Sequence, residues 1–162
     1  MARYSQSYQT LTMVPVADAT NMTSAGFAFI LQGGSATMQL KINEVYIGGE
    51  STSSTPTTMV LARDSTIAVT LSGNFNAAMD ATVTAPGTLA VYGSTASTKP
   101  QRSSTLHLLQ LSLNAYGGIA RWQARYGEEI GVISATQPLG EVSLSSVTGA
   151  GIVSGHCIYE LV

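Results

Sequence analysis

The residues of this chain best suited to catalysis or metal binding are two histidines and one cysteine, His107, His156 and Cys157. His156 and Cys157 are adjacent, so their side chains point to opposite faces if the segment is a strand. Glu160 follows His156 by four residues, which at a rise of about 3.3 Å per residue is a separation of about 13 Å, too long for the two to share a metal ion. The sequence has no cysteine pair, no clustered histidines and no closely spaced aspartates, the usual zinc and calcium signatures. We therefore predict that both histidines are strand residues with one structural hydrogen bond each, and that the protein has no metal site and no cofactor.

Carboxylates are the next candidates for chemistry. On a β-sandwich, two acids that face each other about 5 to 9 Å apart can hydrolyse a glycosidic bond. Glu44, Glu50 and Glu141 are far apart in sequence and could converge in space, whereas the adjacent acids at 128–129 are typical of a solvated turn. Residues 151–155 (GIVSG) are not a nucleophile elbow, because the serine comes one position too late. The prediction is a protein that is not an enzyme, with a sandwich hydrolase as an alternative.

The segment 121–126 (RWQARY) is the most distinctive local feature. In a strand, Trp122, Ala124 and Tyr126 share one face, and the two arginines lie on the other. Arginines in a row on an exposed face could bind carboxylates of another subunit, because a guanidinium binds a carboxylate with two parallel hydrogen bonds. The alternative is a core tryptophan with its neighbouring arginines in water, and the sequence leaves both open.

Two further segments suggest contacts with a neighbouring subunit. Residues 1–7 are mostly polar and are interpreted as an arm that a neighbour would order. Residues 93–104 (GSTASTKPQRSS) are either an exposed loop or an extended arm. The candidate interface residues are Arg3, Tyr4, Tyr8, Lys99, Arg102, Arg121 and Arg125.

Alternation of apolar and polar residues is the main structural signal. In residues 36–42 (ATMQLKI) every second residue is apolar, which places the apolar set on one face of a half-buried strand. Residues 74–81 are the one candidate helix, with Asn74 as its N-cap. Similar patterns or short apolar runs, bounded by Gly, Pro or Ser, predict nine to eleven strands. The candidates are residues 8–16, 25–32, 36–47, 58–63, 66–72, 88–92, 106–114, 119–126, 129–134, 141–145 and 152–161.

Short strands at regular spacing with turn residues between them favour an all-β fold, an antiparallel sandwich or barrel. A jelly roll is the favoured topology. Strands do not alternate with long helical patterns, so a parallel α/β fold is disfavoured. We expect one sandwich domain over residues 8–162, preceded by the arm at 1–7.

Composition excludes several classes of partner. Charged residues are only 10% of the chain, the formal net charge is −2, and the seven basic residues are scattered. Nucleic-acid binding needs clustered basic residues, so it is not expected. No apolar run reaches the roughly 20 residues of a membrane span, and the N-terminus lacks the apolar core of a signal peptide. We expect a protein made in a cytoplasm that stays soluble until it assembles, with no membrane partner.

Four further segments stand out, residues 42–50 (INEVYIGGE), 59–64 (MVLARD), 117–122 (GGIARW) and 156–160 (HCIYE). Together they resemble small jelly-roll structural proteins of tailed bacteriophages, which sit on or between capsid subunits as cement or decoration proteins. The resemblance implies a homo-oligomer, most simply a homotrimer, that binds the major capsid protein and is part of the virion. It assigns no functional residue.

Alternative functions remain open on the same fold. One is a carbohydrate-binding or receptor-binding module of a phage tail or fibre, which would need exposed aromatic side chains over a polar groove. Trp122 is the only tryptophan and is expected to face inward, which gives this alternative little support. A main coat protein that builds the shell alone is a further alternative.

Overall fold

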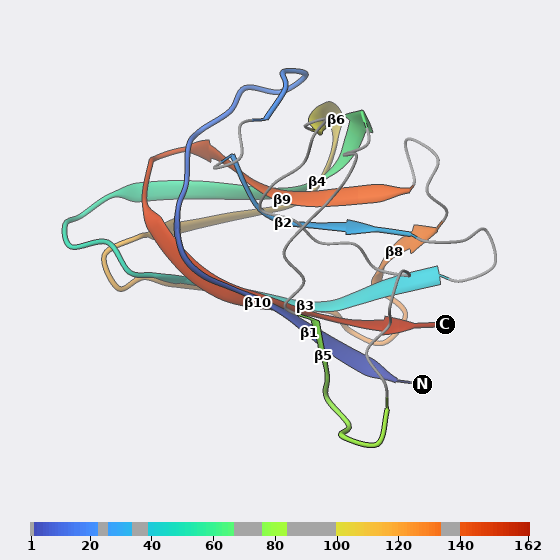
Figure 1. The fold of residues 1–162 in the computed structure, drawn as a ribbon. Coiled ribbons are helices and arrows are strands. Elements are labelled where there is room, and N and C mark those ends of the chain that lie inside the picture. The colour runs from blue at the N-terminus through green and yellow to red at the C-terminus, as the bar shows by residue number, and fades with distance from the viewer. Residues whose placement is uncertain (1, 23–25, 34–38, 67–75, 84–99, 134–139) are drawn as a thin grey trace.

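The computed structural model describes residues 2–22, 26–33, 39–66, 76–83, 100–133 and 140–162, and every regular element in these ranges is a β-strand (Figure 1). The described strands are β1 (Arg3–Thr12), β2 (Phe27–Gln32), β3 (Gln39–Gly49), β4 (Pro56–Thr66), β5 (Asn76–Ala78), β6 (Gln101–Asn114), β7 (Ile119–Gln123), β8 (Ile130–Ile133), β9 (Glu141–Thr148) and β10 (Ile152–Leu161).

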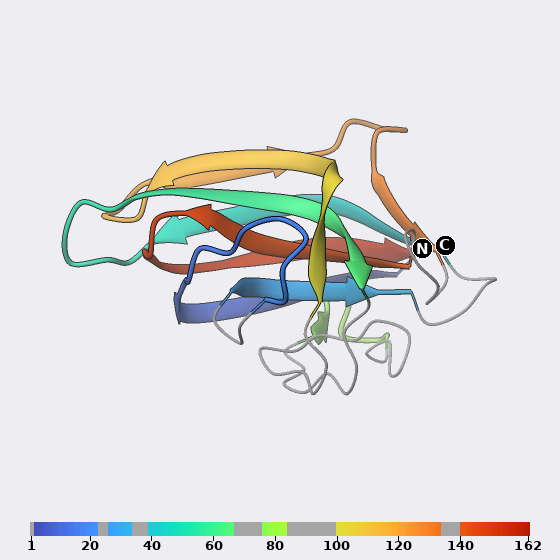
Figure 2. The ribbon, with the colours of Figure 1, turned by 90° about the horizontal axis from the view of Figure 1, so that it is seen from above.

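The strands form two antiparallel sheets that pack face to face as a sandwich (Figure 1, Figure 2). The six-stranded sheet has the order β5-β1-β10-β3-β7, and β8 pairs with the first half of β3. The four-stranded sheet has the order β2-β9-β4-β6. Leaving aside the edge strand β5, the chain changes sheet at each successive strand except from β4 to β6 and from β7 to β8. This is the arrangement of a jelly roll. The predicted antiparallel jelly-roll sandwich is confirmed.

The core lies between the sheets and follows the alternation that the sequence shows. In β3, Leu40 and Ile42 face the core, and a β-bulge then shifts the inward set to Val45 and Ile47. The bulge explains why the apolar spacing in this strand changes from two residues to three. Of the strand expected at residues 36–47, positions 36–38 lie outside the described residues.

The outer face of the four-stranded sheet is covered by the segment between β1 and β2. Figure 1 shows this segment, which we call the strap (residues 13–22), passing to the far side of that sheet. Its backbone is tied down at several points, including Val16 N to the carbonyl of Ser146 at 3.0 Å and Ala19 N to the carbonyl of Arg102 at 2.9 Å. Met22 of the strap packs with Phe27 and Ile30 in a second, smaller apolar cluster.

Two local predictions are wrong. Within the candidate helix at 74–81, residues 76–78 form β5, which pairs with β1, and residues 79–83 form a turn closed by Val83 N to the carbonyl of Asp80 at 3.0 Å. Residues 3–7 are not a free arm, because they belong to β1 and pair with β10 and β5 of the same chain. Both errors arise because pairing with a distant strand overrides local preference. The strand expected at 88–92 lies outside the described residues.

The amide side chain of Gln6 is buried without hydrogen-bond partners among the described residues. Gln6 on β1 is fully buried, and neither its amide nitrogen nor its amide oxygen has a hydrogen-bond partner among the described residues. Burying an unpaired amide costs free energy, because its hydrogen bonds to water are lost and not replaced.

We therefore expect Gln6→Met, which keeps the length and flexibility of the side chain, to raise the free energy of unfolding by about 1–3 kcal/mol. Urea denaturation followed by tryptophan fluorescence measures this change. Gln110→Met on β6 is the matched control, since Gln110 is exposed and should give no increase. A Gln6→Met protein that unfolds at a lower urea concentration than the parent would contradict the assignment of Gln6 as an unpaired buried amide.

Candidate interaction site

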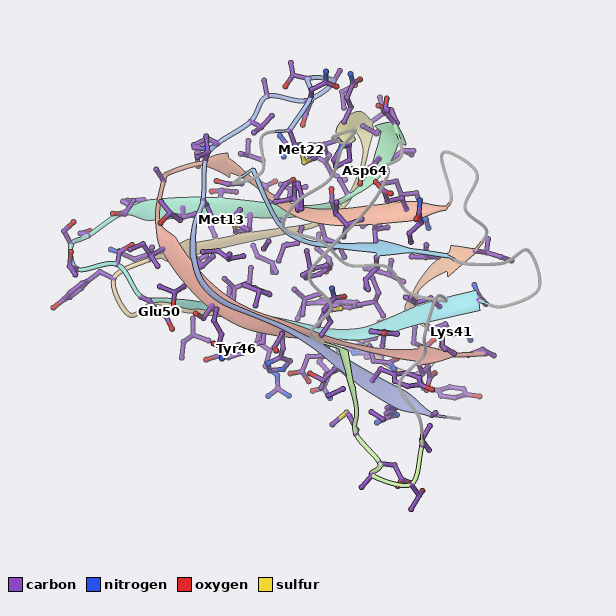
Figure 3. All side chains as sticks on the ribbon, viewed as in Figure 1. Met13, Met22, Lys41, Tyr46, Glu50 and Asp64 are labelled. Carbon is purple, nitrogen blue, oxygen red and sulfur yellow. The ribbon has the colours of Figure 1, made fainter. Side chains whose placement is uncertain are left out.

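The outward side chains of the six-stranded sheet form rows across the strands. In the central row, Ser7 of β1 lies opposite His156 of β10, His156 lies opposite Tyr46 of β3, and Tyr46 lies opposite Arg121 of β7. Figure 3 shows Tyr46 on the side of this sheet that faces away from the four-stranded sheet. These side chains are partly or fully exposed, whereas the strap covers the outer face of the other sheet. The six-stranded sheet therefore has an accessible outer face.

Glu44 organises the charged groups on this face. Its carboxylate accepts two hydrogen bonds from Arg121, from Nε at 3.1 Å and from Nη2 at 2.8 Å. Its Oε1 also lies 3.1 Å from Nε2 of His156, and the His156 ring stacks on Tyr46 with the ring centroids 5.2 Å apart. The hydrogen bonds from Arg121 hold the pKa of Glu44 below its ordinary value, against the opposing effect of burial and with help from His156. The cluster thus fixes one imidazole and one guanidinium in place around an ionised carboxylate.

The strand β7 is an edge of the six-stranded sheet, and large exposed side chains lie on it and in the segments before and after it. Tyr116 is 62% exposed, Ile119 is 66% exposed and Tyr126 is fully exposed. Arg121 and Arg125 are exposed within the same short stretch. Within the described chain β7 pairs only with β3, so its other side presents unpaired backbone groups. We call these five residues the β7 edge.

The structure divides the RWQARY segment differently from its predicted alternation. Trp122 faces inward and packs against the core, opposite in direction to Arg121, as predicted. Tyr126 does not share its face, because β7 ends at Gln123 and Tyr126 lies in the following turn. Arg121 binds a carboxylate of its own chain, Glu44, and its guanidinium stays half-exposed beyond that contact.

Three of the expected interface residues are buried in the chain's own structure, so the interface prediction is wrong for them. Tyr4 stacks on Tyr159 with the ring centroids 5.6 Å apart. The Tyr8 hydroxyl donates to the carbonyl of Tyr46 at 3.0 Å, above Gly155. The side chain of Arg102 is 1% exposed.

Arg102 is buried because it fastens the strap to the four-stranded sheet. Its Nε donates to Asp18 Oδ1 at 2.5 Å, its Nη1 donates to Ser145 Oγ at 2.6 Å, and its Nη2 donates to the carbonyl of Val16. These bonds satisfy a buried charge that would otherwise be costly. Of the remaining expected interface residues, Arg3 is exposed and pairs with Glu160 at 3.8 Å, Arg121 and Arg125 belong to the β7 edge, and Lys99 lies outside the described residues.

The histidines and the cysteine occupy the structural positions predicted for them. His107 lies 3.3 Å from Asp18, and His156 has the contact with Glu44 described above. Cys157 is fully buried on the opposite face of β10, and burial raises the pKa of its thiol. No three His, Cys, Asp or Glu side chains among the described residues lie close enough to hold a metal ion.

The three carboxylates Glu44, Glu50 and Glu141 do not converge, contrary to what a hydrolase site would require. Glu44 lies on the outer face of the six-stranded sheet, and Glu50 is exposed just beyond the end of β3. Glu141 is buried at the start of β9 in the four-stranded sheet.

The four-stranded sheet contains a buried acid pair, Asp64 and Glu141, that the sequence pattern does not predict. Asp64 on β4 is fully buried, and Ser143 Oγ donates to its Oδ1 at 2.7 Å. Burial first, and the nearby charge of Glu141 second, raise the pKa of Asp64 well above its ordinary value. The only sequence signal was an aspartate two positions after Ala62, in phase with the apolar alternation of β4.

Comparison with protein-family models, with curated protein sequences and with solved structures finds no match to this chain. In the described part of the chain, no helix is long and apolar enough to cross a membrane.

The ion pairs of Glu44 predict a specific pH dependence of stability. Because the pKa of Glu44 is lower in the folded chain than in the unfolded chain, these contacts stabilise the fold above about pH 4.5 and are lost as the pH falls through the lowered value. Glu44→Gln should therefore lower the free energy of unfolding at pH 7 by about 1 kcal/mol, since Arg121 is half-exposed. Urea denaturation between pH 3 and pH 7 should show the difference shrinking on acidification, with the exposed Glu128→Gln as control. Parallel curves for Glu44→Gln and the parent would show that the carboxylate has no such role.

The raised pKa of Asp64 predicts the opposite pH dependence, a contribution to the free energy of unfolding that falls as the pH rises. The folded chain holds a proton that the unfolded chain releases near pH 3.8, so this site costs stability progressively as the pH rises above that value. Asp64→Asn removes the ionisable group and leaves an oxygen to accept from Ser143. The variant should gain stability relative to the parent as the pH is raised from 4 to 9. Asp80→Asn is the control, because hydrogen bonds from Thr82 lower the pKa of this exposed carboxyl. If the difference in free energy of unfolding between Asp64→Asn and the parent is constant over this range, Asp64 is not protonated in the folded chain.

Proposed function

We propose that this chain is a structural subunit of a phage virion, a capsid cement or decoration protein that binds the major capsid protein and acts without catalysis. The observation that carries the proposal is the β7 edge. Ile119 and Arg121 are exposed on a strand whose other side is unpaired among the described strands, and Tyr116, Arg125 and Tyr126 are exposed in the segments just before and after it. The jelly-roll fold, the low content of charged residues and the resemblance of four sequence segments to such proteins support it.

The chemistry of the β7 edge suits a protein partner. Tyrosine and arginine are enriched at the residues that dominate binding energy in interfaces. Arg121 is already held in one geometry by Glu44, so less conformational freedom is lost when it docks. Arg125 has no ion-pair partner among the described residues and can bind an acidic group of the partner. The unpaired side of β7 can add a strand from a neighbouring subunit.

Assembly into an oligomer explains how a small contact surface on each subunit can give tight binding to the capsid. In the proposed virion, each subunit contributes a modest surface, and the symmetric homo-oligomer, for which we propose a trimer, engages several lattice sites at once. Linked sites raise the overall affinity well above that of one contact. Light scattering of the purified chain gives the oligomeric state and tests this part of the proposal.

The proposal predicts that the chain is present in purified particles of the phage that encodes it and that particles lacking it melt at a lower temperature. Mass spectrometry and differential scanning fluorimetry measure the two properties. Adding back the wild-type chain should restore the melting temperature, whereas Ile119→Asp should not, since a charge at a two-thirds exposed position opposes docking but not folding.

Val162→Asp is the matched control, because Val162 is about half-exposed and lies at the end of the chain away from β7. It should restore the melting temperature as the wild type does. Particles without this chain, or full restoration by Ile119→Asp, would refute the assignment of the β7 edge as the docking surface.

A further inference from the structure

A hollow lies on the accessible face of the six-stranded sheet, on the side away from β7. Its volume is about 670 Å³, and it is lined from β1, β10 and the residues that directly follow β3 and β5, Glu50 and Met79. Within it, Ser5 is paired with Ile158 and Ser7 with His156, so the four side chains form two adjacent cross-strand pairs. A bulge in β1 between Tyr8 and Leu11 shapes one end of the hollow.

The walls of the hollow carry hydroxyl groups that the chain does not use. The hydroxyls of Ser5 and Ser7 have no hydrogen-bond partner among the described residues. Ser154 Oγ accepts from the backbone N–H of Thr10 at 2.8 Å, which leaves its own proton free to donate. These groups can each donate and accept, which suits a ligand rich in hydroxyls.

His156 supplies a fixed polar and aromatic wall. Its Nε2 is held by Glu44, and its ring is stacked on Tyr46, so its orientation is set before any ligand arrives. The other ring nitrogen has no partner among the described residues. Apolar surface comes from Ile158, two residues along β10 from His156, and from Met79, which is 58% exposed.

The charge of the lining selects the class of ligand. Among the described residues that line the hollow there is no lysine or arginine, and Glu50 is the only acid. Phosphate, sulfate and sialic acid carry negative charge and would meet the Glu50 carboxylate without a compensating cation. A neutral sugar offers hydroxyls to the serines, to Glu50 and to the imidazole, and its C–H face to Met79 and Ile158.

We propose that this hollow binds a neutral saccharide, a hexose unit of an extended glycan. The site is separate from the β7 edge and does not depend on the proposed role in a virion. The chain could then bind a glycan in the hollow on β1 and β10 while the β7 edge contacts the capsid protein.

The test is a glycan array that contains neutral, sialylated and phosphorylated oligosaccharides, followed by calorimetry with the best neutral hexose oligomer. The wild-type chain should bind neutral members and not the charged ones. Ser7→Ala should weaken binding about 3- to 10-fold, the effect expected for the loss of one hydrogen bond, and Ser7→Trp should abolish it by filling the hollow. Neither variant should change the melting temperature by more than Ser104→Ala, the control at an exposed serine on β6.

Three outcomes would overturn the proposal: no neutral glycan bound by the wild type, a preference for charged glycans, or equal binding by Ser7→Trp and the wild type. Binding of a peptide in the hollow in place of a sugar would also overturn it, in favour of protein docking. Failure here and failure of the docking assignment are distinguishable, because Ile119→Asp should keep sugar binding and Ser7→Trp should keep binding to the capsid.

Discussion

The position of β10 between β1 and β3 is the constraint on which the rest of this molecule depends. The last strand of the chain pairs antiparallel with the first strand on one side and with β3 on the other. Its register decides that Cys157 and Tyr159 enter the core while His156 faces outward. A shift of one residue would exchange the two faces and bury the imidazole. The Glu44 cluster and the hollow both exist only in this register.

The two outer faces of the sandwich are used in opposite ways. The chain covers its own four-stranded sheet with the strap and fixes that strap with the buried guanidinium of Arg102. The six-stranded sheet keeps Tyr46, His156 and Arg121 accessible. The outer face of the six-stranded sheet and its edge strand β7 therefore offer surface to other molecules. The proposed protein contact and the proposed sugar site divide this surface between them.

The charged residues of the chain differ in burial, in binding partners and in pKa because their local environments differ. Arg102 and Arg121 have the same chemistry, and each lies in a β-strand. Arg102 is buried and binds the strap, whereas Arg121 is half-exposed and held by Glu44. The acids differ as strongly, since burial raises the pKa of Asp64 and hydrogen bonds from Arg121 lower that of Glu44. The few charged groups of this chain thus differ strongly in burial and in the partners that surround them.

Local pattern was enough for the class of fold. The alternation in β3, the leucine-rich run of β6 and the opposite faces of His156 and Cys157 depend on the two-residue period of a strand, which any short window of sequence reveals. The regular spacing of turns then favoured a sandwich. Correct predictions were those whose physical cause lies within about ten residues of chain.

The sequence by itself determined an all-β sandwich with structural histidines and an inward tryptophan. Only the tertiary structure decided that residues 3–7 enter β1, that residues 76–78 form a strand, and that Tyr4, Tyr8 and Arg102 are buried. It alone brought Glu44, Arg121 and His156 together from three strands, and Asp64 to the buried acid pair. The reason is that strand pairing joins residues many tens of positions apart, and no local period specifies which strands become neighbours or in which register.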